Sequence, residues 1–475
     1  MKDTITAVVN RVGRELSSRV LTLGELVDLA ERENVPLSHL VVAEAMVREE
    51  STYDEILDRS AAIFGHNFEA LEVGLTSGRS FLLGTVGSDL AKQDDLPLMQ
   101  DTLLDRAVMY TLATEVGNHE IGLRPCAGTG DSCPYTGLLR ALREEGYDRY
   151  RLGLATVLIL KVGSIFRSGK QTTGCNMEGF GAGASATAAA LTDLRGGTAR
   201  QVAKAIVLAL SPTIAVPCTP RVMVAGLCAT HIGSAILVGN LASNLVLKST
   251  IPVDVDVDVM IAMAARIHTE AAPVITGINL EYMGPYFQKK PQIEPFVDES
   301  VRETEKANAA QIVTQAREEI RELIASARPV TQILGDVVVG GSSMAVGSPT
   351  NMARICHAMT AGKITKIEID LTIDLFTRRA INVPAILMGA IYGARTDDVE
   401  MYHSVFQRPE IRDIEVTINK ADEPQVQRIR IEAAEQSAMV DARNRGGGRV
   451  AIIDATPSVE EAVQAAEGLG IEVVA

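Results

Sequence analysis

Residues 303–327 read ETEKANAAQIVTQAREEIRELIASA, a stretch in which charged residues alternate with apolar residues at helical spacing. Pro329 follows, and the character of the sequence changes after it. We therefore predict a long charged helix that links two domains, because a helix with so little apolar surface cannot be the core of either one. The domains expected on its two sides are residues 1–328, which include the linker, and residues 329–475.

The two sides have different hydrophobic patterns. Before the linker, apolar residues recur every three or four positions, as in TLGELVDLAERENVPLSHLVVAEAM (residues 22–46), where Thr22 and Glu25 have the spacing of a helix-capping box. Ser51 is the expected N-cap of a later helix. After Pro329, segments such as KITKIEIDL (363–371), DIEVTIN (413–419) and RVAIIDA (449–455) have the alternation of strands. DIEVTIN and residues 426–435 are expected to be paired strands, and further strands are expected before the Gly340–Gly341 loop and at the C-terminal IEVVA. The fold class that we predict is a mostly α-helical domain followed by a smaller α+β domain.

Composition excludes several classes of protein. The formal net charge is −15, which argues against nucleic acid or an anionic membrane as the main partner. Aromatic residues are only 4% of the chain and Trp is absent, so the core must be aliphatic and Ala-rich. The first residues, MKDTITAVVNRVGRELSS, lack an apolar signal segment, and we expect a cytoplasmic protein.

One segment is long and apolar enough for a bilayer. Residues 222–247 contain no Asp, Glu, Lys or Arg. They do contain His231, Asn240 and Asn244, and a helix buried inside a large soluble protein has the same composition. We favour the buried helix over a membrane span.

Three of the six cysteines lie close together in the sequence. Cys175 and Cys218 are 43 residues apart, and Cys228 follows ten residues later. Such thiols can be small buried core residues or thiolate ligands of a metal centre. There is no CxxC pair, and the spacing matches no zinc or ferredoxin signature, so spacing alone favours the packing role.

The sequence around these cysteines favours the metal centre. GCNMEGFGAGASATAAALTDLRGGTARQVAKAIVLAL (174–210) resembles the cluster region of iron–sulfur-dependent L-serine dehydratases, and Cys218 and Cys228 fall near its later ligands. An alignment that puts Cys218 on the family's Pro-Cys leaves one ligand missing and ranks second. GLTSGRSFLLGTVGSDLAK (74–92), TEVGNHEIGLRPCAGTGDSCPYTGLL (114–139) and IPVDVDVDVMIAMAARIHTEAAP (251–273) are similar to other segments of that family's α part. GGSSMAVGSPTNMARICHAMTAGKITKIEIDL (340–371) is similar to its β part, so the resemblance covers most of the chain.

The resemblance implies a [4Fe-4S] cluster held by Cys175, Cys218 and Cys228, with one iron left free to polarise a substrate hydroxyl. It implies elimination of water from L-serine to give pyruvate and ammonia, and a homo-oligomer, expected to be a dimer. Candidate catalytic residues are Cys133 and His119, both expected on loops, as is Glu120, and Lys170; each of the three candidates can equally be lining, structural or solvated. Residues that the resemblance places at the substrate are Thr129, Ser342, Ser343 and Gly347.

The β-like segment departs from the family pattern. Met344 and Ala345 stand where the family has His-Thr, and Arg378 and Arg379 occur in a segment from which a His is lost. An Arg fork suits a carboxylate, so the substrate can be a non-amino dicarboxylate such as 2-(hydroxymethyl)glutarate; both Arg side chains facing solvent is the alternative. L-cysteine desulfidation and a non-enzymatic iron–sulfur protein remain further alternatives. Cys126 has no assigned role, and Cys356, on an apolar helical face, is expected in the core.

Overall fold

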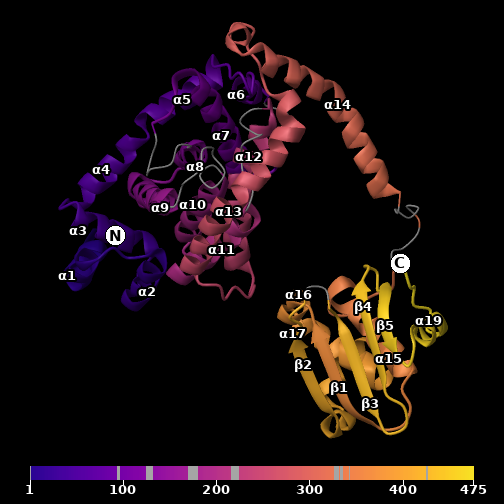
Figure 1. The fold of residues 1–475 in the computed structure, drawn as a ribbon. Coiled ribbons are helices and arrows are strands. Elements are labelled where there is room, and N and C mark those ends of the chain that lie inside the picture. The colour runs from indigo at the N-terminus through magenta and orange to yellow at the C-terminus, as the bar shows by residue number, and fades with distance from the viewer. Residues whose placement is uncertain are drawn as a thin grey trace. The chain divides into compact units, whose positions relative to one another are not determined.

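The computed structural model of the protein describes residues 2–93, 97–124, 132–168, 180–214, 224–325, 331, 335–341, 343–423 and 426–474. Contacts between Cα atoms divide the chain into two compact units, Met1–Glu318 and Glu319–Ala475. The division falls inside the helix α14 (Glu299–Ile324), whereas the expected boundary lay after residue 328. The first unit is helical, and the second combines helices with a five-stranded sheet, which confirms the predicted fold class at this level (Figure 1).

The first unit is made of helices, as its sequence predicts, because apolar residues recur in it at helical spacing. The capping box predicted at Thr22 and Glu25 is confirmed at the start of α2. At α4 the expected cap, Ser51, is wrong by one residue, since Thr52 and Glu55 form the capping box. The described helices of this unit are α1 Lys2–Ser18, α2 Leu23–Glu33, α3 Leu37–Arg48, α4 Tyr53–Ile63, α5 Gly65–Thr76, α6 Val86–Ala91, α7 Thr102–Ile121, α8 Cys133–Glu144, α9 Arg149–Ser168, α10 Gly183–Leu194, α11 Ala199–Leu210, α12 Leu227–Lys248 and α13 Val257–Met283.

Small residues allow the central helices to pack closely. A Cβ atom added to Gly117 of α7 would lie 1.8 Å from the carbonyl oxygen of Ala70 in α5, and one added to Gly137 of α8 would lie 2.4 Å from Thr111 Oγ1 in α7. A Cβ on Gly239 of α12 would lie 2.5 Å from Thr187 Cβ in α10. Only glycine fits at these crossings, so the sequence sets how near α5, α7 and α8 approach one another, and how near α10 and α12 do.

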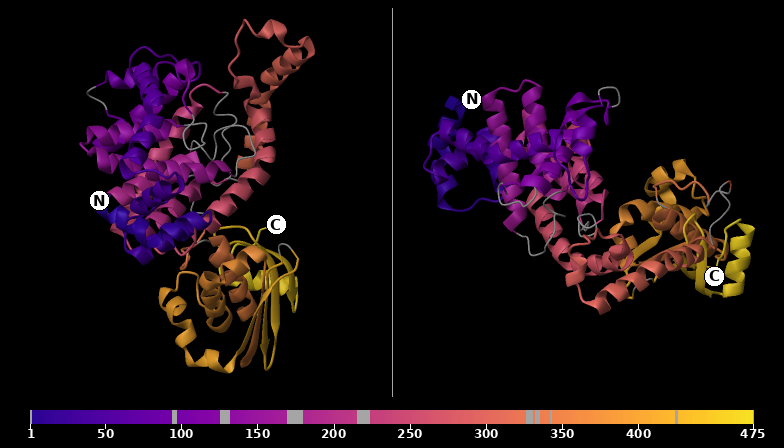
Figure 2. Two further views of the ribbon diagram at one scale, coloured as in Figure 1. Left: turned by 90° about the vertical axis from the view of Figure 1, so that its left-hand side faces the viewer. Right: turned by 90° about the horizontal axis from the view of Figure 1, so that it is seen from above.

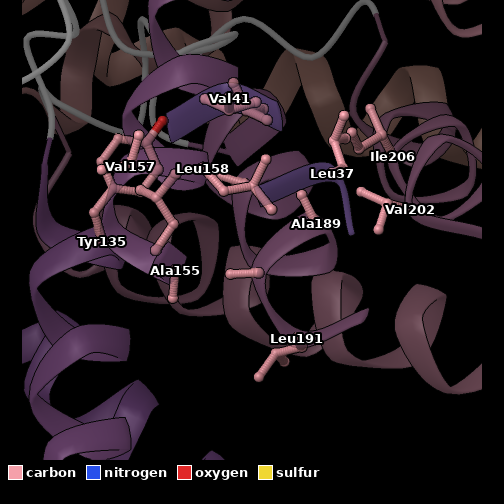
Figure 3. Close-up of a cluster of buried hydrophobic side chains, with 14 of the residues drawn as sticks. Leu37, Val41, Tyr135, Ala155, Val157, Leu158, Ala189, Leu191, Val202 and Ile206 are labelled. Carbon is pink, nitrogen blue, oxygen red and sulfur yellow. The ribbon is translucent and has the colours of Figure 1, made fainter. Parts of the chain in front are cut away.

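The core of the helical unit is aliphatic, as its composition requires. Side chains from α3, α8, α9, α10 and α11 meet in the cluster that Figure 3 shows, where Leu158, Ala189 and Ile206 are fully buried. At about 25 cal/mol per Å² of apolar surface removed from water, each fully buried Leu or Ile contributes about 1.5–3 kcal/mol. The candidate residues His119, Cys133 and Cys228 belong to helices of this unit.

α12 is the one described helix that is long and apolar enough to cross a membrane. Half of its most apolar window is buried inside the protein, and the helix packs against α10 and α11. Its buried face includes His231 and Asn240, which agrees with the expected core helix. The same composition occurs in core helices of soluble proteins.

The second unit is built on a sheet with the strand order β2-β1-β3-β4-β5. β1 and β2 are parallel, and the other neighbours are antiparallel. In β1, Ile367, Ile369 and Leu371 are buried on one face, while the residues between them are partly exposed, as expected for a sheet covered on one side. The described strands are β1 Ile364–Leu371, β2 Glu415–Lys420, β3 Arg428–Ala433, β4 Ala438–Asn444 and β5 Val450–Thr456.

Helices lie against one face of this sheet (Figures 1 and 2). α15 packs on β3 and β4, α17 packs on α15, and α19 packs on β5. Cys356 of α15 is fully buried, which confirms its expected place in the core. The bounds are η5 Ser343–Gly347, α15 Ser348–Ala358, α16 Ile373–Thr377, α17 Arg379–Tyr392, α18 Val399–Ser404 and α19 Val459–Gly468.

Three local expectations for the second unit are wrong. Segments 413–419 and 426–435 were expected to pair, but β1 lies between β2 and β3. A strand was expected before the Gly340–Gly341 loop, and residues 335–339 are not a strand. The C-terminal IEVV contributes a single bridge, between Val450 and Val473, instead of a full strand.

Candidate active site

A buried carboxylate, Glu115, is the centre of a polar cluster inside the helical unit. His119 Nε2 lies 3.3 Å from Glu115 Oε1, one helical turn further along α7. Cys133 Sγ donates to Glu115 Oε2 at 2.8 Å, and Cys228 Sγ lies 4.0 Å from Oε1. Residues from α7, α8 and α12 therefore converge at one point, and we call Glu115, His119, Cys133 and Cys228 the Glu115 cluster.

The hydrogen bonds assign the tautomer of His119. Ser80 Oγ accepts from the backbone N–H groups of Leu82 and Leu83 at 3.0 and 2.8 Å, and it lies 2.5 Å from His119 Nδ1. Since its acceptor positions are occupied, the Ser80 hydroxyl donates to Nδ1, and the ring proton of neutral His119 is on Nε2, directed at Glu115. Sequence analysis placed His119 on a loop, but it lies in the last turn of α7.

Glu115 is ionised in this environment. Burial alone would raise the pKa of the Glu115 carboxyl, but hydrogen bonds donated by His119, Cys133 and Asn118 outweigh burial and hold the pKa below its usual value. Asn118 Nδ2 donates to Oε2 at 3.1 Å. A buried carboxylate with several donors is a defined electrostatic centre of the kind found at functional sites.

Cys133 and Cys228 each lie in the first turn of a helix. Cys133 is the first residue of α8 and Cys228 the second of α12, and both thiols are buried. The hydrogen bond that Cys133 donates to Glu115 keeps the proton on its sulfur, so Cys133 is a thiol here. Cys133 was expected on a loop, whereas the helix starts at it.

The described ends of two cysteine-bearing segments each lie close to α12, one in space and one in the sequence. Phe180 is the first described residue after the segment that contains Cys175, and its ring contacts His231 edge-on with 5.3 Å between centroids. Val224 is the first described residue after the segment that contains Cys218, and it lies four residues before Cys228.

Five of the residues named from sequence lie outside the described residues, as does Cys126: Thr129, Lys170, Cys175, Cys218 and Ser342.

Within the described parts of the chain, no three His, Cys, Asp or Glu side chains are arranged to hold a metal ion. Two of the three expected cluster ligands, Cys175 and Cys218, are outside those parts. The third, Cys228, is buried beside a carboxylate at a helix start.

The second unit contains a cavity of about 780 Å³ at the start of η5 and α16. We call it the Arg378 cavity. Met344 and Ala345, the two residues that depart from the family loop, line it together with Arg378. Its charged lining residues are Arg378, Lys420, Arg443 and Arg445 on the cationic side and Asp374, Asp422 and Glu423 on the acidic side.

Two side-chain oxygens in this cavity lack hydrogen-bond donors among the described residues. They are Oε1 of Gln427, which is 7% exposed, and Oδ1 of Asn444. Unsatisfied buried acceptors cost free energy unless a ligand or water donates to them. The cationic side chains suit a small molecule with a carboxylate, whereas the two oxygens themselves are shielded from solvent.

The two neighbouring arginines have different surroundings. Arg378 lines the cavity and lies 3.5 Å from Asp374. Arg379 Nη1 donates to the carbonyl oxygen of Phe376 at 2.9 Å, and its guanidinium lies over the Phe376 ring. Arg379 is not among the residues that line the cavity.

Ser343 and Gly347 hold the loop in place. Ser343 Oγ accepts from the Gly447 N–H at 2.9 Å, and Ser348 Oγ donates to the Ser343 carbonyl oxygen at 3.1 Å. Gly347 is buried, and a Cβ there would lie 2.8 Å from Val338 Cγ2. These contacts fix the backbone beside Met344, whose carbonyl oxygen accepts from Asn444 Nδ2 at 2.7 Å.

Sequence analysis missed Glu115 as a functional candidate. The signal is its spacing from Asn118 and His119, which puts all three on one face of a helix. If residues 119 and 120 are taken as a loop, His119 is not on the helix, and the shared face of Glu115, Asn118 and His119 is not recognised.

No family model matches the chain, and no curated protein matches it significantly.

Proposed function

We propose that the chain is an iron–sulfur-dependent lyase of the L-serine dehydratase type, which eliminates water from a β-hydroxy acid in the cytoplasm. The observation that carries this proposal is the Glu115 cluster. Cys133 and Cys228 come from distant parts of the sequence and meet at a buried carboxylate and a histidine. The sequence resemblance had assigned those cysteines and that histidine to one site.

Cys228, with Cys175 and Cys218, would hold a [4Fe-4S] cluster. Cys228 fits this role because it is buried, lies in the first turn of α12 and has polar neighbours. Phe180 and Val224, which follow the segments of the other two cysteines, lie beside or just before that turn. When bound, the cluster would supply a Lewis acid for the leaving hydroxyl.

The residues of the Glu115 cluster would handle the protons of the elimination. The ionised Glu115 accepts hydrogen bonds from His119 Nε2 and Cys133 Sγ, and each of these contacts is a path along which a proton could be received or returned. Ser80 fixes the His119 ring through Nδ1. Lys170, outside the described residues, is proposed to bind a substrate carboxylate.

A hydroxymethyl dicarboxylate such as 2-(hydroxymethyl)glutarate is the second candidate substrate. Arg378 favours it, because this arginine lines a cavity with Lys420, Arg443 and Arg445, and guanidinium groups bind carboxylates in a bidentate manner. L-serine, with one carboxylate, would use fewer of these cations.

The test of the cofactor is anaerobic purification with iron and sulfide counting, on the wild type and on the variants Cys175→Ser, Cys218→Ser and Cys228→Ser. We expect about four irons and four sulfides per wild-type chain and loss of most of both in each variant. Cys356→Ser is the matched control, because Cys356 is buried in the second unit. A colourless, iron-free protein with full activity on a hydroxy acid would overturn the proposal.

The test of the reaction is a screen of L-serine, 2-(hydroxymethyl)glutarate and L-cysteine with the cluster-loaded protein. Release of pyruvate and ammonia from serine supports the first substrate, and formation of an unsaturated diacid supports the second. Sulfide release from cysteine identifies a desulfidase. A loaded protein whose cluster spectrum no substrate perturbs, and which turns over none of them, identifies a non-enzymatic iron–sulfur protein.

Arg378 separates the two dehydratase candidates. For a dicarboxylate, Arg378→Ala should raise KM about tenfold or more, since a charge-assisted hydrogen bond contributes about 1.5–3 kcal/mol. Arg379→Ala is the matched control, because its side chain is held by Phe376. Equal changes in KM in the two variants would show that Arg378 does not bind the substrate.

A further inference from the structure

A cavity of about 420 Å³ lies between α3, α4 and α9 of the helical unit. No residue of the Glu115 cluster lines it, and its volume is in the range of small-molecule sites. Val41 and Val157, two of its wall residues, also belong to the buried cluster drawn in Figure 3, so this wall is part of the packed core. The other apolar side chains of the lining are Val20, Ala45, Ile56, Ile63 and Leu160.

One wall of the cavity carries a buried ion pair. Glu44 of α3 is 3% exposed, and its Oε2 accepts from Lys161 Nζ of α9 at 2.6 Å. Its Oε1 lies 3.3 Å from Arg48 Nε, one helical turn further along α3. Because a buried charge is stable only when it is paired, Glu44 holds both cations at the cavity wall.

Lys161 has more donors than its contacts use. Its ammonium carries three N–H groups, and among the residues that the structure describes Glu44 is its one acceptor. The Lys161 side chain is 19% exposed, so it is largely shielded from water. Donors shielded in this way cost free energy until an acceptor meets them. An acceptor that enters the cavity is therefore favoured beside Lys161.

The charges of the lining favour an anion. Three cations and two carboxylates line the cavity, which leaves one positive charge: Arg48, Arg59 and Lys161 against Glu44 and Glu49. Both carboxylates are already paired, Glu44 as described and Glu49 with Arg59 Nη1 at 3.5 Å. An ammonium ligand would therefore find no unpaired carboxylate in the lining, whereas a carboxylate ligand can accept from Lys161 and Arg48.

We propose that this cavity, which we call the Lys161 cavity, binds an aliphatic monocarboxylate. The carboxylate would accept from Lys161 Nζ and from the Arg48 guanidinium, and the hydrocarbon chain would lie against the apolar side chains of the lining. One anionic head group matches the single positive charge in excess, and a second polar group against the apolar walls would cost free energy. The proposal is independent of the proposed function, because neither the Glu115 cluster nor the Arg378 cavity takes part in it.

Isothermal titration calorimetry of the full chain with octanoate tests the site, and octan-1-ol and octylammonium are probes with the same hydrocarbon chain. We expect saturable binding of one octanoate per chain, at least tenfold weaker binding of octan-1-ol and no binding of octylammonium. A lost charge-assisted hydrogen bond accounts for a difference of this size. Binding of either probe as tightly as octanoate would show an apolar site without a position for a carboxylate, and would overturn the proposal.

Two variants locate the carboxylate and the hydrocarbon chain. Lys161→Met removes the ammonium but keeps an apolar side chain, so it should weaken octanoate binding about tenfold or more and leave octan-1-ol binding unchanged. Ala45→Phe fills the cavity without changing a charge and should abolish binding of both molecules. Lys204→Met is the matched control, because Lys204 lies on α11 and does not line the cavity; it should bind octanoate as the wild type does.

Circular dichroism establishes that the three variants are folded, and the three probes test the charge preference on the wild type even where a variant does not fold. Absence of saturable octanoate binding at millimolar concentration would contradict the proposal. So would a folded Lys161→Met protein with the octanoate affinity of the wild type. Unchanged binding by a folded Ala45→Phe protein would place the octanoate outside this cavity and overturn the assignment.

Discussion

At the residue scale, Glu115 holds the candidate site together. Its carboxylate accepts from His119, Cys133 and Asn118, which belong to α7 and α8. Removal of the carboxylate takes away the acceptor that these three donors share. Breaking a buried charged network in this way costs more than losing an exposed ion pair.

We predict that Glu115→Ala lowers the free energy of unfolding by about 2–4 kcal/mol. Urea denaturation followed by far-ultraviolet circular dichroism measures the change, because most of the helix belongs to the first unit. Glu120→Ala is the control on the same helix; Glu120 accepts one bond, from the Arg79 N–H at 2.8 Å, and its loss should cost less than about 1 kcal/mol. Similar decreases in the free energy of unfolding of the two variants would show that Glu115 contributes no more to stability than Glu120 does.

Cys356 gives a second prediction at this scale. Burial raises the pKa of the Cys356 thiol to about 12 from 9.0. Because the folded pKa is above the unfolded value, the contribution to stability is complete below about pH 9 and decreases as the pH rises toward 12. In the native protein at about pH 8.5, iodoacetamide should leave Cys356 unmodified, since the thiolate is the reactive form.

Peptide mass spectrometry of the labelled protein measures this reactivity, with protein unfolded in urea as the positive control. In the unfolded chain Cys356 should be alkylated to completion. Rapid labelling of Cys356 in the native state would contradict its burial in the core of the second unit.

At the scale of elements, glycines determine whether α7 can place Glu115 and His119. Gly117 lies between these two residues, and a Cβ there would meet the Ala70 carbonyl oxygen at 1.8 Å. The Ala70 carbonyl is part of the backbone and cannot move aside as a flexible side chain can, so helices α5 and α7 would have to move apart. The geometry of the Glu115 cluster thus depends on a residue that has no functional group of its own.

We predict that Gly117→Ala lowers the midpoint of thermal unfolding by several degrees and weakens the Glu115 cluster, even though Ala is the better helix former. Differential scanning calorimetry measures the midpoint. Gly65→Ala is the control on α5, because nothing lies within 4 Å of a Cβ at that position. If Gly117→Ala is as stable as Gly65→Ala, the close crossing of α5 and α7 is incorrect.

Sequence patterns over short segments predicted the helices and strands that depend on residues close together in the sequence. The helices of the first unit, the Thr22 capping box and the strands β1, β2, β3 and β5 follow from periodicity and caps. The neighbours of β2 and β3 did not follow, because which strands pair depends on how distant segments pack. Glu115 was missed for a related reason: α7 continues through His119, beyond the apolar pattern that predicted it.

At the scale of the whole molecule, the chain contains separate hydrophobic cores. The buried clusters of the first unit consist of residues between Ile5 and Ala264. The buried cluster of the second unit consists of residues between Ala345 and Ile471. No described buried cluster contains residues of both units. Each unit therefore has what independent folding requires, a core of its own and a complete set of secondary structure.

We predict that residues 319–475, expressed alone, fold to a native state with the sheet order β2-β1-β3-β4-β5. The reason is that α15 packs on β3 and β4 and α17 packs on α15, all within this unit, and that Ile367, Ile369 and Leu371 belong to its buried cluster. A dispersed amide NMR spectrum and a single cooperative urea transition would verify the prediction. The control is Ile369→Asp, which puts a charge in the centre of the core and should abolish the transition. A wild-type fragment that unfolds without cooperativity would show instead that the second unit needs the helical unit for its stability.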